Sequence, residues 1–122
     1  MEKVLKKKEN YTIDATGKVL GRLSSEIAKM LQGKLEVGFE RHIGSGNSVT
    51  VLNASKLKMT EKRKKETMHE TYSGYPGGLK YRNNADIITK KGYAELVRLA
   101  VYGMLPGNRL RAPMMKKLTI EE

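Results

Sequence analysis

The chain has 122 residues, of which 39% are hydrophobic, enough for one domain with one modest core. Lys and Arg number 24 against 13 Asp and Glu, and the net charge of +11 favours a polyanionic partner. Nucleic acid is favoured over a membrane surface, because membrane binding calls for bulky apolar side chains and the chain has no Trp and one Phe. The absence of Cys excludes disulfides, thiolate catalysis and cysteine-bound metals, and it fits a reducing cytoplasm.

The first residues of the chain are basic. We interpret residues 1–10 as a basic N-terminal arm, because no apolar stretch with a cleavage site follows to make a secretory signal. No apolar run approaches membrane-spanning length, so we expect no membrane partner. Residues 11–122 carry no linker or internal repeat, and we predict that they form a single RNA-binding α/β domain.

A strand, a helix and a second strand are predicted in the first half of this domain. Residues 11–14 alternate apolar and polar side chains, which indicates a short strand. Apolar residues recur at helical spacing over 20–31, and Gly33 stands where a left-handed helix stop belongs. After a loop over 38–46, the β-branched run 49–52 suits a buried strand. This order predicts a parallel crossover.

The second half of the domain is predicted to contain two more strands, separate from each other in sequence, and two helices. Residues 56–59 alternate again and are interpreted as a third strand, whereas 60–83 show no sustained period. Asn84 is expected to cap a short helix that finishes at Gly92. The pattern over 93–104 traces the clearest helix of the chain, and 118–120 suits a last strand. Helices covering a mostly parallel sheet are the economical interpretation.

Three basic or aromatic segments are candidates for contact with nucleic acid. The run Lys62, Arg63, Lys64 and Lys65 could be an ordinary solvated face, but its position before a Gly-rich segment favours phosphate binding. Residues 72–82 concentrate three of the six Tyr among glycines and cations, where tyrosines can stack on unpaired bases; the alternative is a tight turn with Tyr packed on the core.

The third segment follows the helix over 93–104 and has no acidic residue. Met104 and Leu105 are interpreted as core residues, whereas Arg109 and Arg111 offer guanidinium groups suited to phosphate. No enzyme motif competes strongly with this hypothesis: Gly33 and Lys34 lack the rest of a phosphate-binding loop, and His42 and His69 are isolated and suit loops.

Asp14 is the one acid placed where an α/β enzyme might use it, at the end of the first strand, but turn formation is the simpler role for a single carboxylate there. We therefore predict no catalytic residue, metal site, cofactor or small-molecule substrate. The alternative is a basic enzyme that processes nucleotides or nucleic acid. The sequence argues against it, because it contains no recognisable set of catalytic residues.

Four stretches in order resemble a known family. Residues 11–23, 49–54, 73–78 (SGYPGG) and 100–106 (AVYGMLP) are similar to the thirteenth-protein family of the large ribosomal subunit, in its bacterial form. The resemblance implies a three-layer α/β/α fold with a mainly parallel four-stranded sheet. It also implies a structural, non-enzymatic role in the cytoplasmic ribosome, with binding of large-subunit ribosomal RNA, support of subunit assembly and contacts to neighbouring ribosomal proteins.

The resemblance and the basic segments together define the expected RNA contacts. By likeness to the family, 62–65 match a basic loop leading to the SGYPGG turn, and Asn108 and Arg109 match the polar exit of the GMLP helix. The full predicted set is Lys18, Arg22, Lys34, Arg41, His42, Lys62, Arg63, Lys64, Lys65, Tyr72, Ser73, Gly74, Tyr75, Gly77, Gly78, Lys80, Tyr81, Arg82, Asn108, Arg109, Arg111, Lys116 and Lys117.

Overall fold

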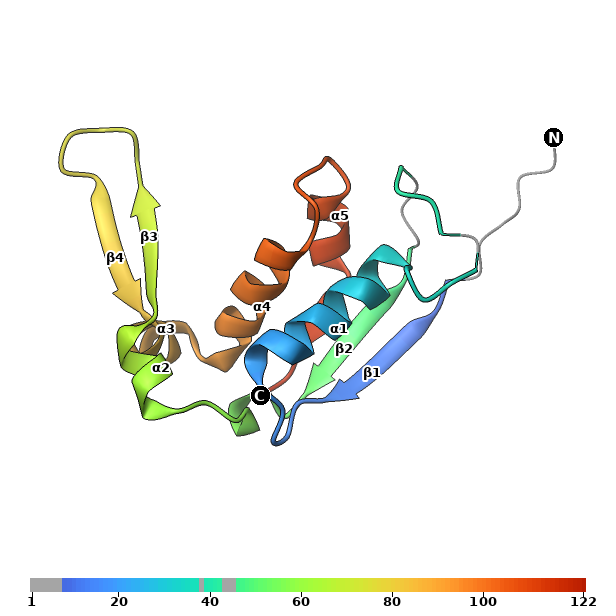
Figure 1. Cartoon of the computed structure of the whole chain (residues 1–122), viewed down its shortest axis with the longest axis horizontal. Coiled ribbons are helices and arrows are strands. Elements are labelled where there is room, and N and C mark those ends of the chain that lie inside the picture. The colour runs from blue at the N-terminus through green and yellow to red at the C-terminus, as the bar shows by residue number, and fades with distance from the viewer. Residues whose placement is uncertain (1–7, 38, 43–45) are drawn as a thin grey trace.

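The computed structural model describes residues 8–37, 39–42 and 46–122 (Figure 1). The predicted arm over 1–10 therefore lies mostly outside the described residues, as does part of the predicted loop over 38–46. The elements in chain order are β1 (Asn10–Asp14), α1 (Leu20–Gln32), β2 (Ser48–Leu52), the 3₁₀ turn η1 (Ala54–Lys56), α2 (Glu61–Glu66), β3 (Met68–Tyr72), β4 (Leu79–Asn83), α3 (Asn84–Lys91), α4 (Tyr93–Met104), α5 (Arg111–Lys116) and β5 (Leu118–Ile120).

The central sheet is parallel, with strand order β1-β2-β5. Ile13 lies opposite Val51, which in turn lies opposite Ile120, so the apolar residues of all three strands share one face. The predicted strands over 11–14, 49–52 and 118–120 are confirmed, and so is the parallel crossover from β1 to β2.

Two helices close this apolar face. In α1, Leu23, Ile27 and Leu31 are buried at a spacing of four residues, and the helix ends where Gly33 adopts φ 80° and donates its N–H to the Lys29 and Met30 carbonyls. Helix α4 packs directly on α1 and contributes Val97 and Val101 to the same core. Both helices, and the Gly33 stop, agree with the sequence prediction.

The predicted four-stranded, three-layer arrangement is wrong for the described residues. The parallel sheet has three strands, and β3 and β4 form a separate antiparallel sheet. Since α1 and α4 pack on each other, they cover the same face; on the opposite face Thr12, Thr50 and Thr119 lie side by side and are exposed or half-exposed. The body is mixed α/β with two layers over this part of the chain.

Residues 56–59 do not form the predicted third strand. Asn53 takes φ 58° directly after β2 and turns the chain into η1. Beyond it, Lys58 makes one isolated bridge to Val19, and Leu57 alone is buried. The alternating pattern came from one apolar side chain inserted into the core between exposed lysines, which is too short for a strand.

Candidate nucleic-acid interface

Three projections extend to one side of the molecule, at the top of Figure 1. They are the β3–β4 hairpin, the connection between α4 and α5, and the segment after α1 with its described residues 34–37 and 39–42. The hairpin stands apart from the body, whereas the other two projections lie above the ends of α4 and α1. Predicted RNA contacts carried by these projections are Lys34, Arg41, His42, Tyr72, Ser73, Gly74, Tyr75, Gly77, Gly78, Lys80, Tyr81, Arg82, Asn108 and Arg109.

Other predicted contacts are not brought to this side. The turn between β1 and α1 and the helix α2 both lie toward the bottom of Figure 1. Lys18 belongs to that turn and pairs with Glu26, with Nζ 3.8 Å from Oε2, while Arg22 is exposed on the first turn of α1. The predicted residues therefore form two groups rather than one continuous patch.

The run 62–65 is a helix and not the predicted loop. Thr60 caps α2 by accepting the Arg63 N–H at 3.3 Å. Lys62 lies 4.0 Å from the Glu66 carboxylate, whereas Arg63 and Lys65 form no ion pair with any described residue. The helix was missed because it is six residues long and has no buried apolar stripe.

Lys64 differs from its neighbours because it turns toward the protein. Its Nζ lies 3.5 Å from Glu61 Oε1, and its side chain is 24% exposed against 78% for Lys62. The nearby Tyr93 phenol and then the Glu61 carboxylate raise the pKa of Lys64. Of the four predicted phosphate ligands, Lys64 is thus the least exposed.

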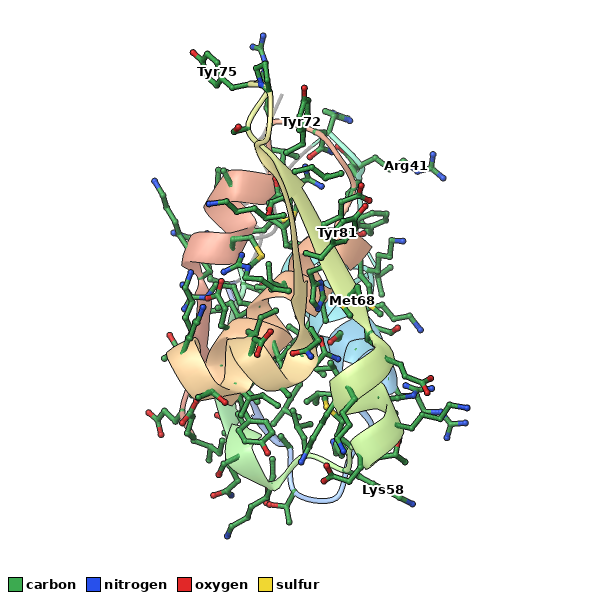
Figure 2. All side chains as sticks on the ribbon, turned by 90° about the vertical axis from the view of Figure 1, so that its left-hand side faces the viewer. Arg41, Lys58, Met68, Tyr72, Tyr75 and Tyr81 are labelled. Carbon is green, nitrogen blue, oxygen red and sulfur yellow. The ribbon has the colours of Figure 1, made fainter. Side chains whose placement is uncertain are left out.

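One face of the β3–β4 hairpin carries its exposed apolar and aromatic side chains together with Glu70 and Asn83, and the other face is polar. Met68 and Tyr72 share a face with Leu79 and Tyr81, and each of these side chains is at least 46% exposed. The opposite face pairs His69 with Arg82 and Thr71 with Lys80. Figure 2 shows Tyr72 and Tyr81 along the arm and Tyr75 at its tip. The alternative of Tyr packed on the core is excluded for these three residues.

The glycines of the hairpin tip serve the turn. Gly74 and Gly77 adopt φ 87° and 75°, which disfavour any side chain. A Cβ on Gly78 would overlap the Ser73 hydroxyl and lie 3.0 Å from the Tyr75 carbonyl oxygen. The φ of Gly77 therefore favours glycine directly, whereas an added methyl group at Gly78 would have to displace the Ser73 hydroxyl and crowd the Tyr75 carbonyl oxygen.

A hydrogen-bonded cluster that the sequence did not predict holds the base of the hairpin. Asn84 is 5% exposed; its Oδ1 lies 2.6 Å from His69 Nε2, and its Nδ2 donates to the Arg63 carbonyl at 3.3 Å. His69 is therefore a strand residue with a partner, not a loop residue. The cap of α3 is Asn83, which accepts the Asp86 N–H at 2.8 Å, so the predicted Asn84 cap is off by one position.

The helix exit after α4 divides its residues between core and surface. Leu105 is 3% exposed, as predicted, but Met104 is 42% exposed and is not a core residue. The Arg111 guanidinium lies 3.9 Å from the centre of the Tyr102 ring, a cation–π contact that the sequence did not suggest. Arg109 and Lys116 are exposed, and Lys117 is half-buried.

Asp14 is a turn residue. Its Oδ1 accepts hydrogen bonds from the Thr16 hydroxyl at 2.7 Å, the Thr16 N–H at 2.9 Å and the Asn53 amide at 3.1 Å. These bonds, the Thr16 hydroxyl first, lower the pKa of Asp14 from 3.8 to about 2. A carboxylate that remains ionised and bonded in this way is poorly suited to general acid catalysis at neutral pH.

The fold and this surface define a small, basic, mixed α/β protein with exposed cations and tyrosines on projecting segments. Among its described residues, no group of three His, Asp or Glu side chains could hold a metal ion, and no helix is long and apolar enough to cross a membrane.

Comparison with known proteins identifies the family. Residues 8–121 match the family model of ribosomal protein L13. The chain is 49% identical over 110 residues to large ribosomal subunit protein uL13 of Natranaerobius thermophilus, covering 90% of this chain and 76% of the relative. It is 44% identical over 117 residues to uL13 of Pelotomaculum thermopropionicum, covering 95% of this chain and 80% of the relative. It is 42% identical over 114 residues to uL13 of Syntrophotalea carbinolica, and these residues cover 93% of this chain and 80% of the relative.

The chain belongs to the ribosomal protein L13 family. It is thus a structural constituent of the large ribosomal subunit and not an enzyme, as predicted. Its place is the ribosome, which in bacteria lies in the cytoplasm, and this confirms the expected localisation.

Proposed function

We propose that this protein binds large-subunit ribosomal RNA and supports subunit assembly, with the three projections as its principal contact surface. The observation that carries the proposal is the tyrosine-bearing hairpin: Tyr72, Tyr75 and Tyr81 are 67%, 74% and 59% exposed on an arm with no hydrophobic core of its own. A two-stranded hairpin is marginally stable alone in water, so a partner that covers these side chains stabilises it.

Cations on the same projections favour RNA as that partner. Lys34, Arg41, Lys80 and Arg109 are exposed and form no ion pair with any described residue. Each phosphate that such a cation neutralises releases a counterion, and tyrosine rings offer stacking surfaces to unpaired bases. Residues 1–10 add charge as an arm, residues 11–122 act as a single RNA-binding domain, and neighbouring large-subunit proteins complete the contacts.

Sedimentation tests the proposal directly. The protein is expected to cosediment with the large subunit on a sucrose gradient and to remain bound until salt is high, because many phosphate contacts make binding steeply salt-dependent. The purified protein is also expected to bind large-subunit ribosomal RNA without other proteins. A protein found only in the free fractions, with no affinity for that RNA, would contradict the proposal.

A further inference from the structure

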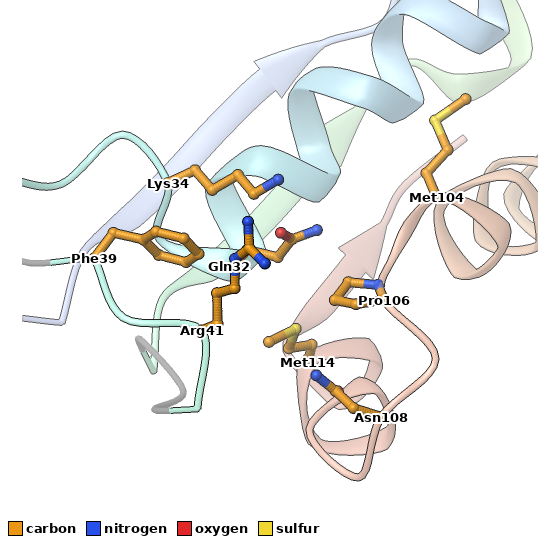
Figure 3. A pocket seen from close by; sticks show the side chains of 8 residues that line it. All are labelled: Gln32, Lys34, Phe39, Arg41, Met104, Pro106, Asn108 and Met114. Carbon is orange, nitrogen blue, oxygen red and sulfur yellow. The ribbon is translucent and has the colours of Figure 1, made fainter.

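A pocket of about 350 Å³ lies between two of the projections (Figure 3). Its volume is within the range of small-ligand sites, which begins at about 300 Å³. The segment after α1 forms one wall, and the connection from α4 to α5 forms the other. The lining residues are Gln32, Lys34, Phe39, Arg41, Met104, Pro106, Asn108 and Met114.

Helix ends shape both walls of this pocket. Gly33 stops α1 with its positive φ, so Gln32 ends the helix and Lys34 begins the turn that leads to the segment with Phe39. Across the gap, Pro106 and Asn108 follow α4, and Asn108 is held by its N–H to the Pro106 carbonyl at 2.9 Å and by its Oδ1, which accepts the Leu110 N–H at 3.1 Å. The end of α1 and the turn after α4 therefore fix where the two walls begin.

The pocket combines an aromatic ring, thioethers and cations. Figure 3 shows the side chains of Lys34, Arg41 and Gln32 directed toward one another beside the Phe39 ring, with Pro106 and Met114 facing them. None of the lining residues is acidic. Such a set suits a ligand with a flat π face and a negative charge, because the ring and Pro106 offer stacking surfaces and the cations offer phosphate contacts.

We propose that this pocket binds a single unpaired nucleotide of RNA. The base stacks on Phe39, a neighbouring phosphate meets Arg41 and Lys34, and the Asn108 amide donates to the base edge. The proposal rests on the proposed RNA binding. RNA is favoured over a free nucleotide because the pocket is open and lies on the side of the molecule from which all three projections extend.

Two substitutions separate stacking from charge. Phe39→Leu keeps apolar volume but removes the aromatic face, and it should weaken binding to large-subunit ribosomal RNA about five- to a hundredfold, the range that follows from base–aromatic stacking energies. Its salt dependence should not change, because Phe carries no charge. Arg41→Gln should weaken binding and reduce the salt slope by about one.

The matched control is Lys91→Gln, at the end of α3, which precedes the opposite end of α4 and is remote from the pocket. Affinities and salt slopes are measured on the whole protein, with the melting temperature of each variant as a check on folding. If the wild-type protein binds the RNA and Phe39→Leu binds it equally well, the pocket proposal is contradicted while the proposed RNA binding of the protein still holds. If the wild-type protein does not bind the RNA, the proposed function fails.

A photoreactive phenylalanine at position 39 gives a second, independent measurement. In assembled large subunits it should crosslink to one RNA nucleotide, mapped by primer extension, and that nucleotide should lack a base-paired partner. Crosslinks to a protein neighbour alone, or to several paired nucleotides, would overturn the proposal. The same probe at position 98, on the exposed face of α4, serves as the comparison.

Discussion

The body and the β3–β4 hairpin use strands in opposite ways. In the body, Ile13, Val49 and Val51 are at most 6% exposed, and the parallel strands are held by the core that they form with α1 and α4. In the hairpin, Tyr72, Tyr81, Met68 and Leu79 face solvent. Burial in the core thus stabilises the body, whereas the hairpin depends on the hydrogen bonds at its base and on its turn.

The largest expected effect comes from truncating an aliphatic side chain in each region. Ile27→Ala, in the core, should lower the free energy of unfolding by about 2–5 kcal/mol, because it leaves a cavity. Leu79→Ala, in the hairpin, should change it by no more than about 0.5 kcal/mol, since Leu79 is 46% exposed. Chemical denaturation of both variants makes the comparison, and equal losses would mean that the hairpin shares the core.

The base of the hairpin is the next test. Asn84→Ala removes the hydrogen bonds to His69 and to the Arg63 carbonyl, and it should cost about 1–3 kcal/mol because buried partners lose their bonds. Hydrogen exchange should speed up in α2, β3 and β4 more than in the parallel sheet. Uniform acceleration over all strands would show that Asn84 supports the body as well.

The hairpin turn should be more sensitive to a methyl group than its exposure suggests. Gly77→Ala places a side chain at φ 75° and should cost the hairpin about 1–2 kcal/mol. Gly77→Asn is the matched control, because Asn adopts this backbone region more readily, and it should be milder. Hydrogen exchange of β3 and β4 measures both, and an Ala variant with wild-type protection would contradict the turn assignment.

Surface charge should affect binding and leave both regions folded. Changing Lys62, Arg63 and Lys65 to Gln keeps helix propensity, so stability should shift by less than about 0.5 kcal/mol. The salt slope of RNA binding should fall by about three, because each of the three cations neutralises about one phosphate. Lys64→Gln, which alters the residue held by Glu61, should change the slope least. An unchanged slope in the triple variant would remove α2 from the interface.

The smallest effect concerns the turn after β1 and its response to pH. The folded-state pKa of Asp14 is lowered to about 2 from 3.8, so its contribution to stability is present above pH 3.8 and is lost as pH falls toward 2. Asp14→Asn should therefore melt below the wild type at neutral pH, and the difference should shrink between pH 4 and pH 2. A difference independent of pH would contradict the hydrogen-bond assignment.

Sequence periodicity predicted the body because the body is where side-chain burial repeats. Residues 20–31 and 93–104 show a helical repeat because one face of each helix packs in the core. Residues 49–52 form a largely apolar, β-branched run because β2 is the central strand. Residues 60–83 carry no such repeat, because α2, β3 and β4 bury almost nothing. For the glycine-rich residues 73–78 within this region, the sequence left a tight turn and an RNA contact as alternatives.

For the candidate site, charge and aromatic content indicated which residue types to expect, but not how the fold arranges them. Charge and aromatic content correctly located exposed cations and tyrosines, yet Lys18, Lys64 and Arg111 proved to be engaged by Glu26, Glu61 and Tyr102. Phe39 and Gln32 were missed because pocket lining arises from the approach of segments far apart in sequence. The single Phe of the chain, at position 39 with Lys34 and Arg41 nearby in sequence, was the one signal that could have indicated the pocket.

The sequence by itself determined the class of this protein: its charge, its core helices and strands, and the ordered motifs of the L13 family. Each is a local or compositional property, so it can be read without knowing which segments meet. Only the tertiary structure decided the three-stranded sheet with one open face, the separate hairpin, and which cations remain available. These features depend on contacts between residues that are distant in sequence. At residues 56–59, for example, the turn at Asn53 leads the chain into η1, and the local alternating pattern does not produce a strand.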